Sequence, residues 1–365
     1  MKTQVTKFLL VLLSLLAILK CSSEVHEKIL DSFMESPPKE LFKVFHFLFT
    51  KGYELDSEEG VKRYKVFKKN LKVIKETNSK DLPYKLGVND FADLTTEEFT
   101  QKYLMKEGEF QKTFEKSIRN LREEEGFFDK FADIDDSQDP DSGKTPLNYT
   151  PIDWTGYFGP IRNQGTCGSC WAFAVLGTVE AYWAKKNGQI SSYLSPQQLI
   201  DCDLNNWGCN GGDTNYALNY IMKNGVVADA AYPYTGVRGT CKIPNSLKTK
   251  FSSFTYCQNG SYYYPCKESL IYSRLTSGPQ TTAIDGTTLQ LYRSGIFTAK
   301  CSTRNHAVIL VGYGSYVYNG VTYNYWKIRN SWGPYWGESG YVRVLANEAN
   351  LNSCYVTAQS FSVTP

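Results

Sequence analysis

The chain has 365 residues, ten cysteines and a formal net charge of +3, with 40 basic residues against 37 acidic ones. This length accommodates a pro-region and one large domain, or two to three ordinary domains. A charge so close to neutral gives no basic footprint for nucleic acid. The longest apolar run covers only residues 8–19, too few to span a bilayer. We therefore expect neither a nucleic-acid partner nor stable insertion into a membrane.

The first residues have the pattern of a secretory signal peptide. Lys2 and Lys7 precede the apolar run, and the small residues Cys21-Ser22-Ser23 follow it. We expect a signal peptide at residues 1–23, removed on export. An exported protein enters an oxidising compartment, in which cysteines become candidates for disulfides.

The cysteine count leaves one thiol over. Nine of the ten cysteines lie between Cys167 and Cys354. Because nine is odd, at least one of them stays unpaired if the others pair completely. An unpaired thiol is what a cysteine nucleophile requires.

Residues 24–144 form a cysteine-free region of opposite charge to the rest of the chain. They carry 21 Lys and Arg against 27 Asp and Glu, a net of −6, whereas residues 145–365 carry 16 against 10, a net of +6. Opposite charges on two parts of one chain favour docking of one on the other. The alternative is two unrelated domains with ordinary charge scatter.

Two patterns stand out within this region. Between residues 59 and 78, steps of three and four place six side chains on one stripe of a helix: Glu59, Arg63, Phe67, Asn70, Ile74 and Asn78. An ordinary amphipathic core helix explains the apolar members but not the two asparagines. Eight residues further on, Gly87-Val88-Asn89-Asp90-Phe91-Ala92-Asp93 has the form G-x-N-x-F-x-D.

The remainder of the chain divides into a linker and a domain. Residues 102–144 are charged and irregular, and we expect an exposed processing linker there and a mature domain at 145–365. Within the domain, Trp171–Lys186 has helical spacing and a second helix is expected to begin at Ser195-Pro196. Ala307–Tyr313 and Tyr323–Arg329 read as strands. Helices first and strands later predict an α+β fold with two lobes.

Cys170 is the candidate nucleophile. It lies in Gln164–Ala174, QGTCGSCWAFA, where a glycine-rich loop leads into an apolar helix. At the first turn of that helix the partial positive charge of the N-terminus favours a thiolate. The alternative for Cys170 alone is a buried cysteine or half of a disulfide.

A thiol nucleophile requires a base and a group that orients the base. His306 is the one histidine after residue 145, so it is the candidate base. Asn330 can accept from the imidazole without adding charge, and Trp332 can shield that bond from water. Gln164 can offer its amide N–H to a developing oxyanion, together with the backbone N–H of Cys170.

These patterns together resemble the cathepsin L-like proteases of the papain family. The E-R-F-N-I-N stripe and the G-x-N-x-F-x-D segment resemble that family's prosegment, and QGTCGSCWAF, GCNGG, NHAVILVGYG and NSWGPYWGESGY resemble papain and the cathepsins. The resemblance implies a papain-like α+β fold, with an α-rich left lobe and a β-barrel-like right lobe. It implies a mainly helical inhibitory propeptide at 24–144, with an inhibitor domain at about 41–100 and an acidic linker at 102–144. Such a prosegment lies through the active-site cleft in the reverse direction to a substrate.

The resemblance also implies roles for individual residues. Gln164 becomes the oxyanion donor, Cys170 the nucleophile, His306 the base and then acid, and Asn330 the orienting residue. Substrate is expected to contact Gly168, Gly211, Gly212, Thr214, Ala283, Asn305, Trp332 and Gln359. Thr214, Ala283 and Gln359 match the pocket that reads the residue second before the cut bond (P2), and we expect that pocket to accept hydrophobic side chains.

Disulfides and glycosylation complete the expectations for the domain. The resemblance implies the pairs Cys167–Cys209, Cys202–Cys241 and Cys301–Cys354. Cys257 and Cys266 remain, and we predict a fourth, local disulfide between them, with two free thiols as the alternative. Asn148 and Asn259 begin glycosylation sequons.

The predicted function is that of a cysteine endopeptidase made as a zymogen. A single histidine in the mature domain excludes the histidine-bearing loops of exopeptidase relatives. The expected partners are protein and peptide substrates, the chain's own propeptide and cystatin-type inhibitors; we expect a monomer without metal or cofactor, in a lysosome-like vacuole or outside the cell. The competing hypothesis is a catalytically inactive relative that acts as a binding protein. It would be expected to lack the nucleophile, the base or the orienting residue, and all three are present.

Overall fold

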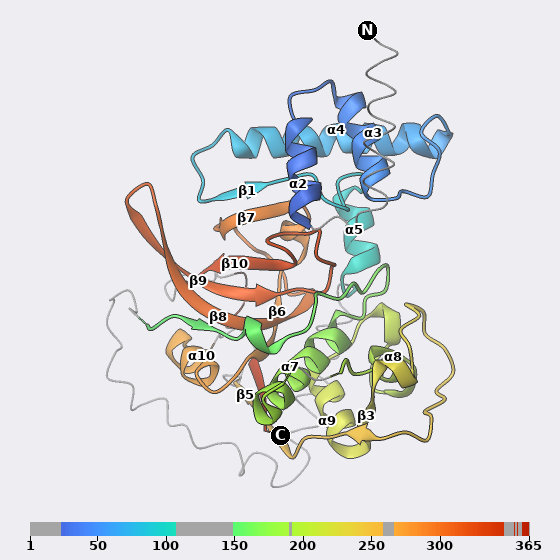
Figure 1. Cartoon of the computed structure of the whole chain (residues 1–365), viewed down its shortest axis with the longest axis vertical. Helices are drawn as coiled ribbons and strands as arrows, with labels where there is room; N and C mark the ends of the chain where they lie inside the picture. The colour runs from blue at the N-terminus through green and yellow to red at the C-terminus, as the bar shows by residue number, and fades with distance from the viewer. Residues whose placement is uncertain are drawn as a thin grey trace.

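The computed structural model describes residues 23–106, 149–189, 192–257, 266–346 and 360–364, together with Cys354 and Val356. Most of the predicted signal peptide and linker, the sequons at Asn148 and Asn259, and Gln359 lie outside these residues. The described parts form a helical prosegment above two lobes, one rich in helices and one built on a sheet (Figure 1). The expected two-lobed α+β fold with a helical prosegment is confirmed.

The described part of the prosegment consists of four helices and one short strand. Its elements are α2 (Ser23–Ser32), α3 (Pro38–Leu48), α4 (Glu58–Asn78), β1 (Tyr84–Leu86) and α5 (Thr96–Tyr103). Ser57 caps α4 by accepting from the N–H of Gly60, and Thr95 and Glu98 form a capping box on α5. Phe67 and Ile74 of the α4 stripe are fully buried, as an amphipathic helix requires.

The two asparagines of the stripe bind the end of β1 and the segment that follows it. The Asn70 amide donates to the carbonyls of Ala92 and Leu94, at 2.9 and 2.8 Å. Asn78 donates to the Leu86 carbonyl at 2.8 Å and accepts from its N–H at 2.9 Å. The Asn70 bonds satisfy carbonyls outside regular structure, and the Asn78 bonds hold Leu86, the last residue of β1. The asparagines therefore tie the G-x-N-x-F-x-D segment to α4.

The helical lobe is organised around α7 (Cys170–Asn187). This helix ends at Gly188, whose φ of +70° gives the left-handed C-terminal turn that glycine adopts without strain. The other elements of this lobe are α8 (Pro196–Cys202), α9 (Thr214–Asn224), the short helices at Gly208–Asn210 and Asp229–Ala231, and the strand pair β3 (Val226–Val227) and β4 (Lys248–Thr249).

The second lobe is a sheet that the prosegment extends. Its described strands run in the order β1-β7-β10-β9-β8-β6-β11-β5, and β2 also pairs with β8. Strand β1 of the prosegment pairs antiparallel with β7, so the prosegment covers an edge of the sheet. The elements are β2 (Ile152–Asp153), a short helix at Thr155–Tyr157, β5 (Ser253–Cys257), α10 (Glu268–Leu275), β6 (Gln280–Ile284), a short helix at Thr287–Leu289, β7 (Tyr292–Phe297), β8 (His306–Tyr318), β9 (Val321–Arg329), β10 (Tyr341–Leu345) and β11 (Ser360–Thr364).

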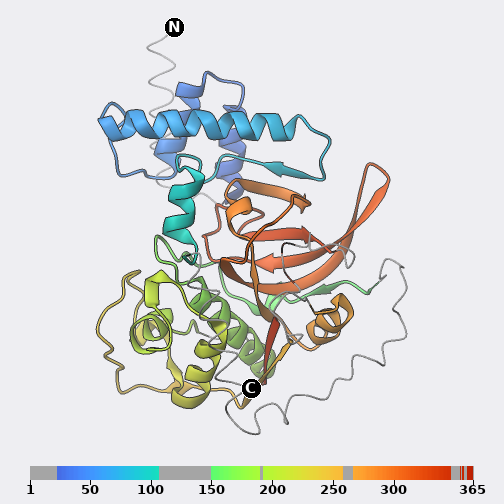
Figure 2. The ribbon, with the colours of Figure 1, turned by 180° about the vertical axis from the view of Figure 1, so that it is seen from behind.

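The β8–β9 hairpin is longer than its two expected strands. The strands continue to Tyr318 and Val321, because the turn between them is Asn319-Gly320, with φ of 48° and 77°. Asn-Gly with positive φ at both residues is the favoured two-residue hairpin turn. The hairpin extends beyond the body of the sheet (Figure 2).

The prosegment and the sheet share one hydrophobic core. Leu41, Phe45 and Phe67 of the prosegment belong to the same buried cluster as Trp332 and Trp336. A second cluster surrounds α7, where it packs against β6, β8 and β11, and includes Met105 near the end of the described part of the prosegment. The prosegment thus folds as part of the structure, and its chain leads from the sheet to the junction between the lobes.

Candidate active site

Cys170 lies at the junction of the lobes, at the first residue of α7. Its Sγ accepts a hydrogen bond from the backbone N–H of Ala307 at 3.4 Å, and the residue is completely buried. Burial raises the pKa of the Cys170 thiol to about 12, although the surrounding backbone N–H groups act in the opposite direction. In the described closed state the sulfur is therefore a neutral thiol.

His306, the first residue of β8, is oriented by Asn330. The distance from His306 Nε2 to Asn330 Oδ1 is 2.7 Å, and Ser331 N–H donates to the same oxygen at 2.7 Å. Because that oxygen acts as the acceptor, Nε2 carries the proton and Nδ1 carries the lone pair. Burial lowers the pKa of His306 to about 4, with Asn330 acting in the opposite direction. The imidazole of the closed state is therefore also neutral.

Trp332 covers this histidine as expected. Its ring stacks on His306 with a centroid separation of 4.4 Å, and only 2% of the residue is exposed. On its other sides it meets Phe91 and Phe99 of the prosegment edge-on, at 5.6 and 5.1 Å. The prosegment therefore contributes to the exclusion of water from the His306–Asn330 bond.

Gln164 is held in place through both polar atoms of its side chain. Its Oε1 accepts from Ser331 Oγ at 2.7 Å, and its Nε2 donates to the carbonyls of Cys167 and Tyr103, at 2.9 and 3.0 Å. The Tyr103 carbonyl belongs to the prosegment. The donor expected to stabilise an oxyanion is thus bound to a carbonyl oxygen of the prosegment.

Residues 104–106 form a strap across the cleft. Met105 N–H donates to the carbonyl of Asn305 at 2.9 Å, and Lys106 N–H to that of Asn210 at 3.5 Å. A Cβ on Gly168 would lie 3.2 Å from the Leu104 carbonyl, and a Cβ on Gly211 would lie 3.3 Å from Met105 Cβ. These two glycines allow the strap to approach the cleft wall closely.

The other predicted substrate residues fall into three groups. Gly212 packs against Asn206 and Trp171. Thr214 and Ala283 are buried, and Ala283 shares an apolar cluster with the buried Met105. Asn305 contributes its carbonyl, because its side chain is held by Gly286 N–H and Thr287 Oγ1, at 2.9 and 2.8 Å.

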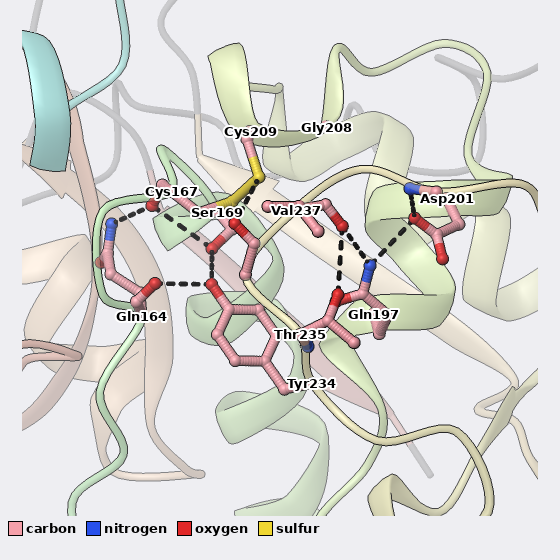
Figure 3. The surroundings of a disulfide bond; sticks show 12 residues. Gln164, Cys167, Ser169, Gln197, Asp201, Gly208, Cys209, Tyr234, Thr235 and Val237 are labelled. Carbon is pink, nitrogen blue, oxygen red and sulfur yellow. Dashed lines mark hydrogen bonds between the residues drawn. A yellow bond between two sulfur atoms is a disulfide. The ribbon is translucent and has the colours of Figure 1, made fainter.

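Two supporting residues were not found from the sequence. Tyr234 donates its hydroxyl to the Gln164 carbonyl at 2.6 Å and lies 2.9 Å from Ser169 Oγ, which fixes the loop before Cys170 (Figure 3). No pattern marks Tyr234 in a tyrosine-rich loop. Ser331 stands between Asn330 and Trp332 in the NSWG block, so its position was a usable signal.

The disulfides leave Cys170 as the free cysteine of the described residues. The bonded pairs are Cys167–Cys209, Cys202–Cys241 and Cys301–Cys354, the pairs that the resemblance implied. The first of them links the loop before α7 to the loop that contains Gly208 and Cys209 (Figure 3). Cys266 is also disulfide-bonded, but no pairing is described for it, so the Cys257–Cys266 bond stays a prediction.

The described residues hold no cluster of three metal-ligating His, Cys, Asp or Glu side chains. Within the same residues, no helix combines the length and apolar character needed to cross a membrane.

Comparison with known proteins identifies both parts of the chain. Residues 150–364 match the papain family of cysteine proteases, and residues 42–99 match the cathepsin propeptide inhibitor domain. Among curated relatives, cysteine protease XCP2 of Arabidopsis thaliana is 39% identical over 316 residues, covering 84% of this chain and 81% of its own. Ananain of Ananas comosus is 36% identical over 322 residues, covering 84% of each chain.

Solved proenzymes have the same architecture. The recombinant stem bromelain precursor is 31% identical with a TM-score of 0.71, covering 90% of this chain and 99% of its own. Digestive procathepsin L 3 of Tenebrio molitor larval midgut is 31% identical with a TM-score of 0.69, covering 91% of this chain and all of its own. The chain therefore belongs to the papain family of cysteine proteases and carries the family's propeptide inhibitor domain in front of the protease.

Proposed function

We propose that this protease is an endopeptidase that forms an acyl-enzyme on Cys170. The observation that carries the proposal is the convergence of Cys170, His306, Asn330 and Gln164 on one cleft, which the prosegment strap fills. When the strap leaves and water enters, the burial that keeps the pair neutral is relieved. Proton transfer from Cys170 to His306 Nδ1 then gives a thiolate at the start of α7, where the helix N-terminus stabilises it.

The reaction proceeds in two halves. The thiolate attacks the peptide carbonyl carbon, and the oxyanion accepts from Gln164 Nε2 and the Cys170 backbone N–H. The imidazolium gives its proton to the departing amine as the C–N bond breaks, which leaves a thioester on Cys170. His306 then takes a proton from water, the hydroxide attacks the thioester, and the acid product leaves as the thiol reforms.

The strap supports a hydrophobic preference at P2. Met105 is 1% exposed and clusters with Ala283 and Ala307 next to the nucleophile. A pocket that buries a methionine side chain favours apolar residues, because each buried methylene contributes about 0.8 kcal/mol. We place Thr214 and Gln359 in the same pocket.

Substrate profiling tests both the activity and the pocket. We expect the activated enzyme to cut internal bonds of blocked peptides, with Leu, Val, Phe or Met at P2 giving kcat/KM about 10- to 200-fold above Gly or Asp at that position. A peptide library with both termini blocked measures this. Cleavage that requires a free terminus would contradict an endopeptidase, and a flat P2 profile would contradict the pocket. Binding without turnover would instead support an inactive binding protein.

Opening of the strap is expected to be proton-linked through His306. In a Cys170→Ala zymogen no thiolate pairs with the imidazole, so the pKa of His306 changes from about 4 in the closed state to about 6.5 when the ring is solvated. The closed state therefore binds fewer protons, so closure is favoured above pH 6.5 and is lost progressively as the pH falls from about 6.5 to 4. Through His306 alone, the equilibrium constant for opening should increase by up to about tenfold for each pH unit that the pH falls within this window.

Hydrogen exchange at the Met105 amide measures this opening in a Cys170→Ala zymogen, which cannot process itself. Comparison with the same protein carrying His306→Gln isolates the histidine from the carboxylates of the prosegment. We expect the opening equilibrium of the double variant to depend less steeply on pH, with up to one proton fewer taken up on opening. Equal slopes in the two proteins would rule out the linkage.

In line with the signal-like residues 1–23, we place the protein in the secretory pathway, ending in a lysosome-like vacuole or outside the cell. We also propose that the mature enzyme is a monomer inhibited by cystatin-type proteins, since these close the kind of cleft that the strap occupies.

A further inference from the structure

Helix α2 docks on the protease although it precedes the part of the prosegment that matches the inhibitor domain. That match begins at residue 42, whereas α2 covers Ser23–Ser32. In Figure 1 the helix lies against the end of the sheet at which β1 pairs with β7. Leu30 is 4% exposed and belongs to the core shared by prosegment and sheet. The helix is therefore packed, and not merely adjacent.

Arg293 of β7 is the polar anchor for the C-terminal end of this helix. Its guanidinium binds both carboxylate oxygens of Asp31, with Nη2 2.6 Å from Oδ2, and lies 3.8 Å from Glu27 Oε2. The Arg293 side chain is 30% exposed, so solvent screens the pair only in part. Fork-to-fork pairing of arginine with a carboxylate is stronger and more specific than a single ion pair.

The stem of the same arginine covers the G-x-N-x-F-x-D segment. A Cβ on Gly87 would lie 2.6 Å from Arg293 Cδ and 3.0 Å from its Cβ. Only glycine fits at that position while the arginine keeps this course. Arg293 thus contacts two separate parts of the prosegment, α2 with its head and Gly87 with its stem.

The N-terminal end of α2 is held by the loop before β10. The His26 ring stacks on Tyr335 with a centroid separation of 4.3 Å and meets Phe49 edge-on at 5.8 Å. The helix is therefore anchored at both ends on the protease, by an ion pair at one and by a stacked ring at the other.

We propose that Arg293 and Tyr335 form a docking site for an acidic amphipathic helix, and that α2 occupies this site to keep the zymogen closed. The proposal rests on the proposed protease function and adds to the inhibitor a segment outside its matched domain. The site joins Arg293 of β7, the strand that pairs with β1, to Tyr335 of the loop before β10, so α2 docks beside the edge at which the rest of the prosegment is bound.

The rate at which the full-length zymogen activates itself tests the proposal. At about pH 5.5, where an ordinary aspartate stays ionised, we expect Asp31→Asn to speed activation about threefold to tenfold, the range that one partly screened bidentate pair allows. Arg293→Asp places like charges together and should act more strongly. The combination of Asp31→Arg with Arg293→Asp restores the pair and should return the rate to within about twofold of the parent.

The matched control is Lys28→Ala on the same helix. The Lys28 side chain is 73% exposed and pairs with Glu24 of α2 itself, so this change should leave the rate unaltered. Rates equal to the parent in Asp31→Asn and Arg293→Asp would overturn the proposal, and so would a double variant no slower than the faster single one.

A second measurement covers variants that fold poorly. Hydrogen exchange in the Cys170→Ala zymogen should show the Leu30 amide losing protection in Arg293→Asp while the amides of α4 keep theirs. Unchanged protection at Leu30 would overturn the proposal. After full activation all variants should share the parental kcat/KM, because Arg293 lies outside the active site. A failure of the proposed function would instead leave every protein inactive, the parent included.

Discussion

Replacement of Cys170 by alanine is expected to lower kcat for peptide hydrolysis by at least about 10⁴-fold. The residue is the free thiol of the described chain, and its sulfur lies at the start of α7 beside Ala307, which follows His306. Without it no thioester forms, so only the binding site and the oxyanion donors remain. We expect His306→Ala to cost a comparable factor, and the double variant to be no worse than either single one, because the two residues act as a unit.

The loss of activity can be assigned to the missing nucleophile only if the variant folds like the parent. Cys170 forms none of the described disulfides, so Cys170→Ala should keep the bonds Cys167–Cys209, Cys202–Cys241 and Cys301–Cys354. Peptide mapping and the melting temperature check this. A correctly folded variant that retains more than about 1% of the parental activity would show that the nucleophile lies elsewhere.

The thiol is expected to be at least about 10³-fold less reactive in the zymogen than in the activated enzyme. Burial raises the pKa of Cys170 to about 12 in the closed state, against an ordinary value near 9. Three pKa units reduce the thiolate fraction at neutral pH by about 10³, and the strap adds a steric barrier. Alkylation of the two forms by iodoacetamide at pH 7, followed by mass spectrometry of the Cys170 peptide, measures the ratio.

A strap variant provides the control for this comparison. Met105 is buried against the cleft wall, and truncation of a buried methionine typically costs about 2–5 kcal/mol. Met105→Ala should therefore open the zymogen more often and raise its alkylation rate without altering the activated enzyme. Lys186→Ala, on an exposed turn at the far end of α7, should leave both rates unchanged. Equal rates for zymogen and activated enzyme would mean that the prosegment does not shield the thiol.

The proposed catalytic set and the prosegment could be located from the sequence because each is marked by distinctive side chains. Cys170 was the candidate at the start of an apolar helix, and His306 was the one histidine of its domain. The stripe on α4 was marked by Asn70 and Asn78, polar residues that an ordinary core helix does not require. The structure supplies the reason, since both amides bind the backbone that leads to the strap.

The features that the sequence did not reveal depend on backbone groups or on distant contacts. The Tyr103 carbonyl binds Gln164 and the Met105 N–H binds Asn305, but any residue carries these groups. Asp31 and Arg293 are ordinary charged residues until the fold brings them together across 262 positions. The length of the β8–β9 hairpin was underestimated, although its Asn319-Gly320 turn is a recognised hairpin signal.

Titration of the activated enzyme with an epoxide affinity label tests most directly whether Cys170 is the nucleophile that the prosegment holds shut. We predict that activity falls in proportion to the label added and vanishes at one equivalent, that the modified peptide contains Cys170, and that the untreated zymogen incorporates no label in the same time. Modification of another residue, activity that survives full labelling of Cys170, or equally rapid labelling of the zymogen would contradict this account.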